Sequence, residues 1–201
     1  MSHIAGACLK EFITNYINDS VVTKQKLLAD SEMLSVVENS AKAIIEVYKN
    51  GGKVLIAGNG GSAADAQHVA TELVSKFMHY RRALSAIALT TNSSILTAIG
   101  NDYSYDQVFV RQIQAYGNEG DIFIAISTSG NSKNIVLAAE EAKRKGMKVI
   151  GLTGGGMSGE FLMDGLCDYL IKIPSESTPI IQDTHIMVEH ILCALVEKEF
   201  I

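Results

Sequence analysis

The sequence predicts an α/β fold in which helices cover both faces of a parallel sheet. After residue 50, short apolar runs alternate with longer segments of helical periodicity. Two of these runs lead directly into glycine- or serine-rich turns that open a helix. Strands that alternate with helices need right-handed crossovers, and these place the helices over the sheet.

Residues 1 to about 50 are expected to form two helices. Apolar side chains recur at helical spacing over 9–17 and again over 34–48. The glycine pair at 51–52 ends the second helix. With 201 residues, 47% of them hydrophobic, the chain is long enough for one domain with a buried core. We therefore expect a single domain over residues 1–201, with residues 1–50 as a helical extension packed on it.

The rest of the chain predicts five strands with helices between them. Four helices are expected in this part of the chain. The first runs from Ser62 to about Phe77, and the second begins at the TTNSS segment at 90–94. The third follows the third strand and ends at Lys145, and the fourth runs from about 178 to 201. In a sheet of this kind, ligands bind at the carboxyl ends of the strands. The strands are expected at 53–57, 85–89, 121–126, 148–152 and 168–173, and a glycine turn at 153–156 follows the fourth.

Composition limits the functions that this chain could have. The 22 acidic and 17 basic side chains give a net charge of −5, which disfavours a broad basic surface for nucleic acid. A small site can still be locally positive and bind an anion. Cys8, Cys167 and Cys193 lack CxxC spacing, which argues against a disulfide framework and a thiolate zinc site. No signal peptide and no long apolar run are found, so we expect a cytoplasmic protein without nucleic-acid or membrane partners.

The turn GNGGS at residues 58–62 joins the first predicted strand to a helix. Glycines let the backbone approach a ligand, and the free N–H groups of the helix attract an anion. Gly58, Gly60 and Ala63 also satisfy the G-x-G-x-x-A pattern of dinucleotide sites. The next strand ends in TTN at 90–92 without the acidic residue that would bind a ribose, so an NAD enzyme is disfavoured. A tight turn without any ligand is the simpler alternative.

The turn STSGNS at residues 127–132 follows the third strand and opens a helix. One serine or threonine there would be an ordinary helix cap. Four hydroxyl groups within six residues instead form a neutral hydrogen-bonding cup that suits a phosphate monoester. This turn therefore predicts phosphate binding.

Titratable and amide side chains occur on two of the predicted helices. His68 and Glu72 lie four residues apart, on one helix face, where they could share a metal or act as acid and base. A solvated polar face is the alternative. Gln182 and His190 are separated by about 80° around the last helix and about 12 Å along it. Either both reach a central ion or different subunits supply them, and His190 alone could be a core histidine.

Four motifs together resemble the bacterial phosphoheptose isomerases, which are also called sedoheptulose-7-phosphate isomerases and have the SIS (sugar isomerase) fold. The motifs match in order and spacing, and the resemblance covers nearly the whole chain. They are GNGGSAADAQH at 58–68, TAIGNDY at 97–103, STSGNS at 127–132 and IQDTH at 181–185.

The resemblance implies a flavodoxin-like three-layer sandwich with a five-stranded parallel sheet, forming a single SIS domain. It also implies a homotetramer in which the N-terminal helices serve oligomerisation and the active sites lie at subunit interfaces. The implied reaction converts D-sedoheptulose 7-phosphate to D-glycero-D-manno-heptose 7-phosphate. This is the first step of heptose nucleotide synthesis for lipopolysaccharide or capsule.

The resemblance also assigns roles to individual positions. Glu72 and His190 match the acid–base pair. With His68 and Gln182, they also match the ligands of one zinc ion per subunit. The implied phosphate-binding positions lie in the turn at 127–132. The full set of substrate-binding positions is Asn59, Gly60, Gly61, Ser62, Glu72, Asn101, Asp102, Ser127, Thr128, Ser129, Ser132 and Gln182.

The chemistry of an aldose–ketose isomerase agrees with these residue types. A carboxylate such as Glu72 can move the carbon proton through an enediolate, and His190 can serve the oxygen atoms. Zinc would polarise the carbonyl, although a ligated carboxylate is a weaker base, so a catalytic and a structural zinc both stay open. Three positions differ from related members of the family. This chain has Lys76 where they have Arg, Ile180 where they have Arg or Lys, and Asp183 where they have Glu. These differences bear on the choice of substrate.

Two other functional hypotheses remain besides a phosphoheptose isomerase. The first is a non-catalytic SIS adaptor of the kind that binds the replication initiator DnaA, which has no need for the acid–base set. The second is an isomerase of another ketose phosphate, such as a hexulose 6-phosphate, in which both turns would look the same. The joint presence of the acid–base and zinc-ligand positions favours the enzyme.

Overall fold

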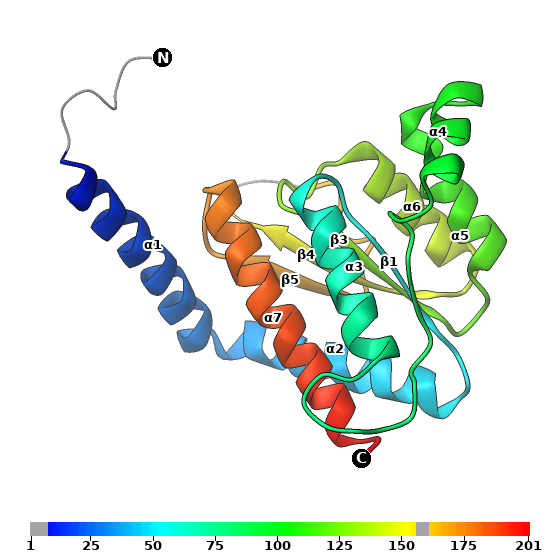
Figure 1. Ribbon diagram of the computed structural model, residues 1–201, viewed down its shortest axis with the longest axis horizontal. Helices are drawn as coiled ribbons and strands as arrows, with labels where there is room; N and C mark the ends of the chain where they lie inside the picture. The colour runs from blue at the N-terminus through cyan, green and yellow to red at the C-terminus, as the bar shows by residue number, and fades with distance from the viewer. Residues whose placement is uncertain (1–7, 156–160) are drawn as a thin grey trace.

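The computed structural model describes residues 8–155 and 161–201. Its five strands form one parallel sheet in the order β2-β1-β3-β4-β5, which confirms the predicted fold class (Figure 1). Two expected features lie partly outside the described residues. These are the end of the glycine turn, at residue 156, and the start of the first helix, at residues 1–7. The strands are β1 (Val54–Ala57), β2 (Ala86–Ala88), β3 (Ile122–Ser127), β4 (Lys148–Gly154) and β5 (Tyr169–Ile173).

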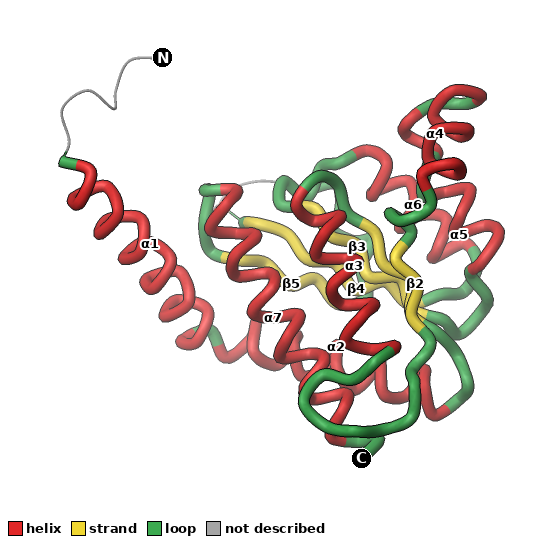
Figure 2. The backbone as a smooth tube through the Cα atoms, in the orientation of Figure 1, coloured by secondary structure: helices red, strands yellow, loops and turns green. Residues whose placement is uncertain are grey.

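Helices cover both faces of the sheet (Figure 2). One core lies between the sheet and α2, α3 and α7, and a second lies between the sheet and α5 and α6. The helices are α1 (Leu9–Ala29), α2 (Ser31–Lys49), α3 (Gly61–Val74), α4 (Ser93–Asp102), α5 (Val110–Tyr116), α6 (Lys133–Arg144) and α7 (Thr178–Lys198), with a 3-10 turn η1 (Tyr105–Gln107).

Alternation of side chains along β1 explains the two cores. Val54 and Ile56 point to the α2, α3 and α7 side, whereas Leu55 and Ala57 point to the α5 and α6 side. All four residues are fully buried. A strand that is apolar on both faces is typical of a parallel sheet covered by helices on each side.

The structure corrects the expected end of α3 and the expected start of the turn after β4, and it adds two short elements. The helix α3 ends at Val74 instead of about Phe77, because the carbonyl of Leu73 accepts a hydrogen bond from the N–H of Leu84. The strand β4 continues to Gly154, which pairs with Ile173, so the turn starts later than predicted. The helix α5 and the turn η1 were not predicted as separate elements.

The two N-terminal helices differ in how they contact the rest of the chain. The helix α2 packs on α7 and β5 and contributes seven buried residues. The helix α1 projects away from the sheet (Figure 1), and only Thr23 and Leu27 along it are buried. Near its C-terminal end, the ammonium of Lys24 lies 2.5 Å from a carboxylate oxygen of Asp183 on α7.

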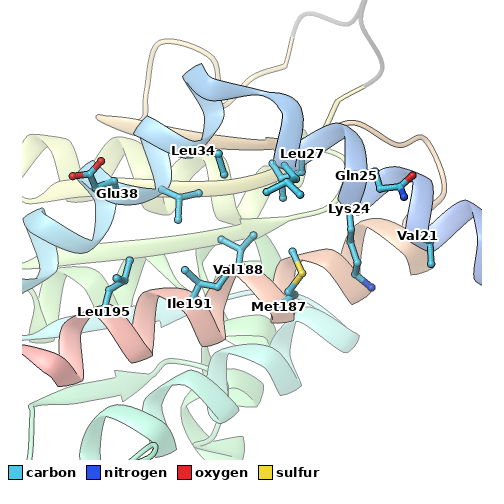
Figure 3. A pocket seen from close by; sticks show the side chains of 12 residues that line it. Val21, Lys24, Gln25, Leu27, Leu34, Glu38, Met187, Val188, Ile191 and Leu195 are labelled. Carbon is cyan, nitrogen blue, oxygen red and sulfur yellow. The ribbon is translucent and has the colours of Figure 1, made fainter.

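An apolar groove of about 520 Å³ lies between α1, α2 and α7 (Figure 3). Side chains from all three helices line it, among them Leu28, Leu34 and Ile191. Among the described residues, none of the helices combines the length and the apolar character needed to cross a membrane.

Candidate active site

The turns after β1 and β3 lie side by side, because these strands are neighbours in the sheet. The amide of Asn59 donates to Asn134 at 2.9 Å and accepts from the Asn134 amide at 2.9 Å. The hydroxyl of Tyr105 lies 3.4 Å from the Asn59 side-chain oxygen. The predicted substrate-binding residue Asn59 is therefore held between η1 and the first turn of α6.

The first turn needs glycine for two different reasons. Gly60 has a φ of +57°, a conformation that L side chains rarely adopt. Gly61 begins α3, and a Cβ there would overlap the amide of Gln182 from α7. Ser62 is 6% exposed. The backbone at Gly61, one of the predicted positions, thus lies close to another of them, Gln182.

The second turn forms a cluster of hydroxyl groups at the start of α6. The hydroxyl of Ser127 donates to that of Ser132 at 2.9 Å and lies 3.5 Å from that of Ser129. Ser132 is the N-cap of α6, yet within the described part of the chain its side chain makes no capping hydrogen bond. The Ser127 hydroxyl also accepts the N–H of Ser132 at 3.4 Å, and the Ser129 hydroxyl accepts that of Asn131 at 3.3 Å. Hydroxyl and N–H groups are thus gathered at one helix N-terminus, which suits an anion with several oxygen atoms.

The helices α3 and α7 bring three predicted residues together. The Nε2 atoms of His68 and His190 lie 2.8 Å apart, and the two rings meet edge to face. The carboxylate of Glu72 lies 3.6 Å from His68 Nε2. Both histidines of this contact therefore come from one chain, His68 from α3 and His190 from α7.

Gln182 does not join this cluster in the structure. Its side-chain amide donates instead to Asp65 on α3, at 3.1 Å and 3.4 Å from the two carboxylate oxygens. Burial raises the pKa of Asp65, although the Gln182 hydrogen bond and the nearby His68 lower it in part. Asp65 was not predicted. Its place on α3, three residues before His68, is the signal that could have found it.

Phe77 is a second residue that the sequence did not indicate. Its ring stacks on the His190 imidazole with the centroids 5.5 Å apart and the planes inclined by 25°. The segment between α3 and β2 carries this ring, and nothing in its local sequence marks Phe77 as a neighbour of α7.

Two other titratable side chains of α7 are buried. Glu189 is 2% exposed, and burial together with Asp65 raises its pKa to about 8. His185 is fully buried, and burial lowers its pKa to about 4 against the opposing effect of the Thr153 backbone. Both side chains are therefore mainly neutral at pH 7.

The structure places Asn101 and Asp102 at the C-terminal end of α4, where both are exposed. The Asn101 amide donates to the Asp102 carboxylate at 2.9 Å. Within residues 8–155 and 161–201, no hydrogen bond joins either side chain to the two turns.

Three predicted departures from related sequences also have clear places. The ammonium of Lys76 lies 3.8 Å from the centroid of the Tyr80 ring. Ile180 is 4% exposed. Hydrogen bonds from Lys24 and Ser20 lower the pKa of Asp183, so this carboxylate is directed to α1.

The residues of the cluster match the donor preferences of zinc in part. Two imidazole nitrogens converge beside a carboxylate, and these are ligand types that zinc accepts. The fourth predicted ligand, Gln182, is hydrogen-bonded to Asp65. Across the described residues, no group of three or more His, Cys, Asp or Glu side chains meets as a formed metal site.

Comparison with known proteins gives a consistent result. Residues 15–154 match the SIS domain family. A phosphoheptose isomerase from Aneurinibacillus thermoaerophilus is 55% identical over 192 residues, which are 94% of each chain. The chain belongs to the phosphoheptose isomerase family.

Solved structures agree with this assignment. A phosphoheptose isomerase from Neisseria gonorrhoeae superposes with a TM-score of 0.87 at 39% identity, over 95% of this chain and 100% of that one. One from Francisella tularensis gives a TM-score of 0.88 at 38% identity, over 96% and 100%. The phosphoheptose isomerase family is a family of enzymes, so a non-catalytic adaptor is not favoured.

Substitution of Gly61 by Ala tests the contact between α3 and α7 in this isomerase. The three atoms nearest the new Cβ all belong to the flexible end of Gln182, so we expect the free energy of unfolding to change by less than about 1 kcal/mol. Isomerase turnover should fall at least about tenfold, because the Gln182 amide is displaced. Thermal unfolding and steady-state kinetics measure the two effects.

Gly51→Ala provides the control with the opposite pattern. Gly51 has a φ of +77° with open space around it. An alanine there should lower stability by about 1 kcal/mol and leave turnover unchanged. Unchanged turnover in Gly61→Ala would contradict the proposed importance of the Gln182 position.

Proposed function

We propose that this phosphoheptose isomerase converts D-sedoheptulose 7-phosphate to D-glycero-D-manno-heptose 7-phosphate, as the first step of heptose nucleotide synthesis for lipopolysaccharide or capsule. The observation that carries the proposal is the convergence of His68, Glu72 and His190 between α3 and α7, in a chain that also has two turns suited to a phosphorylated sugar. Acid–base groups and an anion-binding turn are what such a reaction needs.

The phosphate end of the substrate lies at the turn after β3. Ser127, Thr128, Ser129 and Ser132 supply hydroxyl groups, and the N-terminus of α6 supplies N–H groups and a favourable dipole. This recognition needs no cationic side chain, in keeping with the acidic composition of the chain. The turn after β1, with Asn59, lies next to it.

The sugar end lies at the cluster between α3 and α7. Glu72 removes a proton from C1 of the open-chain ketose, and the electron pair of that bond forms the enediolate. Glu72 then returns the proton to C2, which leaves an aldehyde at C1. His190 moves the proton between the two oxygen atoms, because an imidazole can both donate and accept a proton.

The other predicted positions orient the sugar chain. Asn59 and Gln182 carry amides that can hydrogen-bond hydroxyl groups along its length. Asn101 and Asp102 lie on α4, which leads through η1 to Tyr105 beside Asn59. The backbone of Gly60 and Gly61 and the hydroxyl of Ser62 complete the set.

A zinc ion, one per subunit, is part of the proposal. His68, Glu72, Gln182 and His190 would hold it, because their nitrogen and oxygen atoms are ligands that zinc accepts. Bound zinc supplies Lewis acidity, which polarises a carbonyl and stabilises an enediolate.

Homotetramer formation in the cytoplasm completes the proposal, with residues 1–201 as one SIS domain. The helix α1 exposes a stripe of large apolar side chains, with Leu9 at 74%, Phe12 at 58% and Ile13 at 56% exposure. The groove of Figure 3 continues this apolar surface between α1, α2 and α7. Burial against other copies of the chain would remove this surface from water.

Isotope transfer tests the reaction and the role of Glu72 together. We expect purified protein in D2O to convert sedoheptulose 7-phosphate to heptose 7-phosphate with deuterium at C2, because the enediolate takes a proton from an exchanging acid. Glu72→Gln should lose at least about 100-fold in kcat while it still folds and binds the sugar phosphate. NMR spectroscopy follows the product and its label.

Hexulose 6-phosphates serve as the comparison substrates. Faster turnover of a hexulose 6-phosphate than of the heptulose would replace the proposed substrate by the shorter ketose. Wild-type turnover by Glu72→Gln would refute its role as the base.

Metal analysis tests the zinc site. We expect about one zinc per chain in the wild-type protein and a clear loss in His68→Ala, because His68 supplies one of four ligands. His79→Ala is the matched control, since the His79 side chain is exposed. The zinc proposal would be contradicted if the wild-type protein contained no zinc and a chelator changed neither its melting temperature nor its activity.

Light scattering tests the apolar stripe of α1. Phe12→Asp should convert the tetramer into smaller species, because it places a charge in an interface. Asn18→Asp adds the same charge on the opposite side of α1 and should leave the tetramer intact. A monomeric wild-type protein, or a tetrameric Phe12→Asp variant, would argue against this use of α1.

A further inference from the structure

A buried ion pair joins the segment 75–85, between α3 and β2, to the helix α7. The proposed reaction does not use this pair. The Nε atom of Arg81 lies 3.6 Å from a carboxylate oxygen of Glu197. The two side chains are 1% and 2% exposed. Figure 2 shows this segment as a long loop that passes beside the C-terminal end of α7.

The carboxylate of Glu197 holds the backbone of the segment. One oxygen accepts the N–H of Phe77 at 2.8 Å, and the other accepts those of Met78 and His79 at 2.7 Å and 2.9 Å. Burial alone would raise the pKa of Glu197, but these three N–H groups and Arg81 outweigh it and hold the pKa below its usual range. The carboxylate is therefore charged and fixes three consecutive residues.

The guanidinium of Arg81 holds the end of α3. One of its nitrogens donates to the carbonyl of Glu72 at 2.6 Å, and another donates to the carbonyl of Ser75 at 3.2 Å. Carbonyls in the last turn of a helix lack partners within the helix, and a cation there is favourable. Arg81 thus fixes the backbone of the turn from which the Glu72 side chain extends.

The segment also reaches the second member of the acid–base pair. Phe77, whose N–H is bound by Glu197, stacks on the imidazole of His190. The other edge of that imidazole meets His68. The plane of His190 is therefore set by two rings, and the backbone of one of them is fixed by Glu197.

We propose that the buried Arg81–Glu197 pair positions both members of the acid–base pair: Arg81 through the backbone of Glu72, and Glu197 through Phe77 and the ring of His190. This inference rests on the proposed roles of Glu72 and His190. Arg81 and Glu197 are positioning residues, since both act through other residues.

Stability alone does not account for this arrangement. A buried ion pair often stabilises a fold no more than well-packed apolar side chains do. Within the described chain, the Nε atom of Arg81 has no hydrogen-bond partner, which adds a cost. What the pair does provide is two fixed sets of contacts to main-chain groups next to Glu72 and Phe77.

Kinetics of Glu197→Gln test the proposal. The substitution puts an amide NH2 opposite N–H donors, so the segment should shift. We expect kcat to fall about 10- to 100-fold, since small misplacements of reacting groups cost that much. KM should stay within about twofold, because the substrate-binding turns after β1 and β3 are not touched. Glu199→Gln is the matched control, because Glu199 pairs with Lys49 on the surface near the same helix end.

A double-mutant cycle separates positioning from general loosening. Phe77→Leu removes the stacked ring and should lower kcat in the same way. If Glu197 acts on His190 through Phe77, the two losses will not add in the double variant. Additive losses would overturn that half of the proposal.

The NMR signal of the His190 ring gives a readout that does not require activity. In protein labelled at histidine Cε1, the Phe77 ring current shifts the His190 signal, and Phe77→Leu removes that shift. Glu197→Gln should move the signal toward the Phe77→Leu position, whereas Glu199→Gln should not. An unmoved His190 signal in Glu197→Gln would overturn the positioning role. A wild-type protein that does not turn over sedoheptulose 7-phosphate would refute only the proposed function, and the NMR test would still apply to such a protein.

Stability measurements complete the test. A lower melting temperature in Glu197→Gln with unchanged kcat would mean that the pair serves the fold alone and would overturn the proposal. If Glu197→Gln does not fold, Arg81→Lys takes its place, because lysine keeps the charge but loses the planar fork. A lower kcat with a wild-type KM in Arg81→Lys supports the proposal, and wild-type kcat overturns it.

Discussion

The close approach of α7 to the carboxyl ends of the strands is the constraint on which the site depends. It is possible because two residues there have no Cβ. A Cβ on Gly61 would overlap Gln182, and one on Gly154 would overlap Ile181 and lie 2.7 Å from the Thr128 carbonyl. With these two glycines, the first half of α7 can lie on both α3 and β4. That placement lets His190 meet His68, which is 122 residues away in the sequence.

The two ends of the site are built in different ways. The hydroxyl cluster depends on residues within one turn, because Ser127 and Ser132 are only five positions apart. The acid–base cluster depends on three segments that meet only in the folded chain: α3, α7 and the loop that carries Phe77. A change in a distant segment can therefore disturb the proposed proton-transfer groups, whereas the proposed phosphate-binding turn is sensitive mainly to its own residues.

The same difference explains what could be predicted from the sequence. The strand–turn–helix order, the hydroxyl turn and the His68–Glu72 pair are local patterns, and the structure contains all three. Asp65 shares a face of α3 with His68, which is a local signal, but its contact with Gln182 arises from packing between distant segments. The contact of Phe77 with His190 arises in the same way, and no local pattern indicated it. The helix α5 has only seven residues, too few for a clear periodic signal. The end of α3 was placed too late because the partner of the Leu73 carbonyl is Leu84, beyond the loop.

The loop after α3 joins these observations. The helix ends where the carbonyl of Leu73 accepts a hydrogen bond from Leu84. Beyond that point, Glu197 accepts hydrogen bonds from N–H groups that would bond within α3 if the helix were longer. Ending α3 at Val74 thus frees Phe77 to lie against His190 instead of continuing along α3. A helix continued to Phe77 would have kept that N–H within α3, away from Glu197. The early end of α3 is therefore part of how this chain brings an aromatic ring to the proposed acid–base pair.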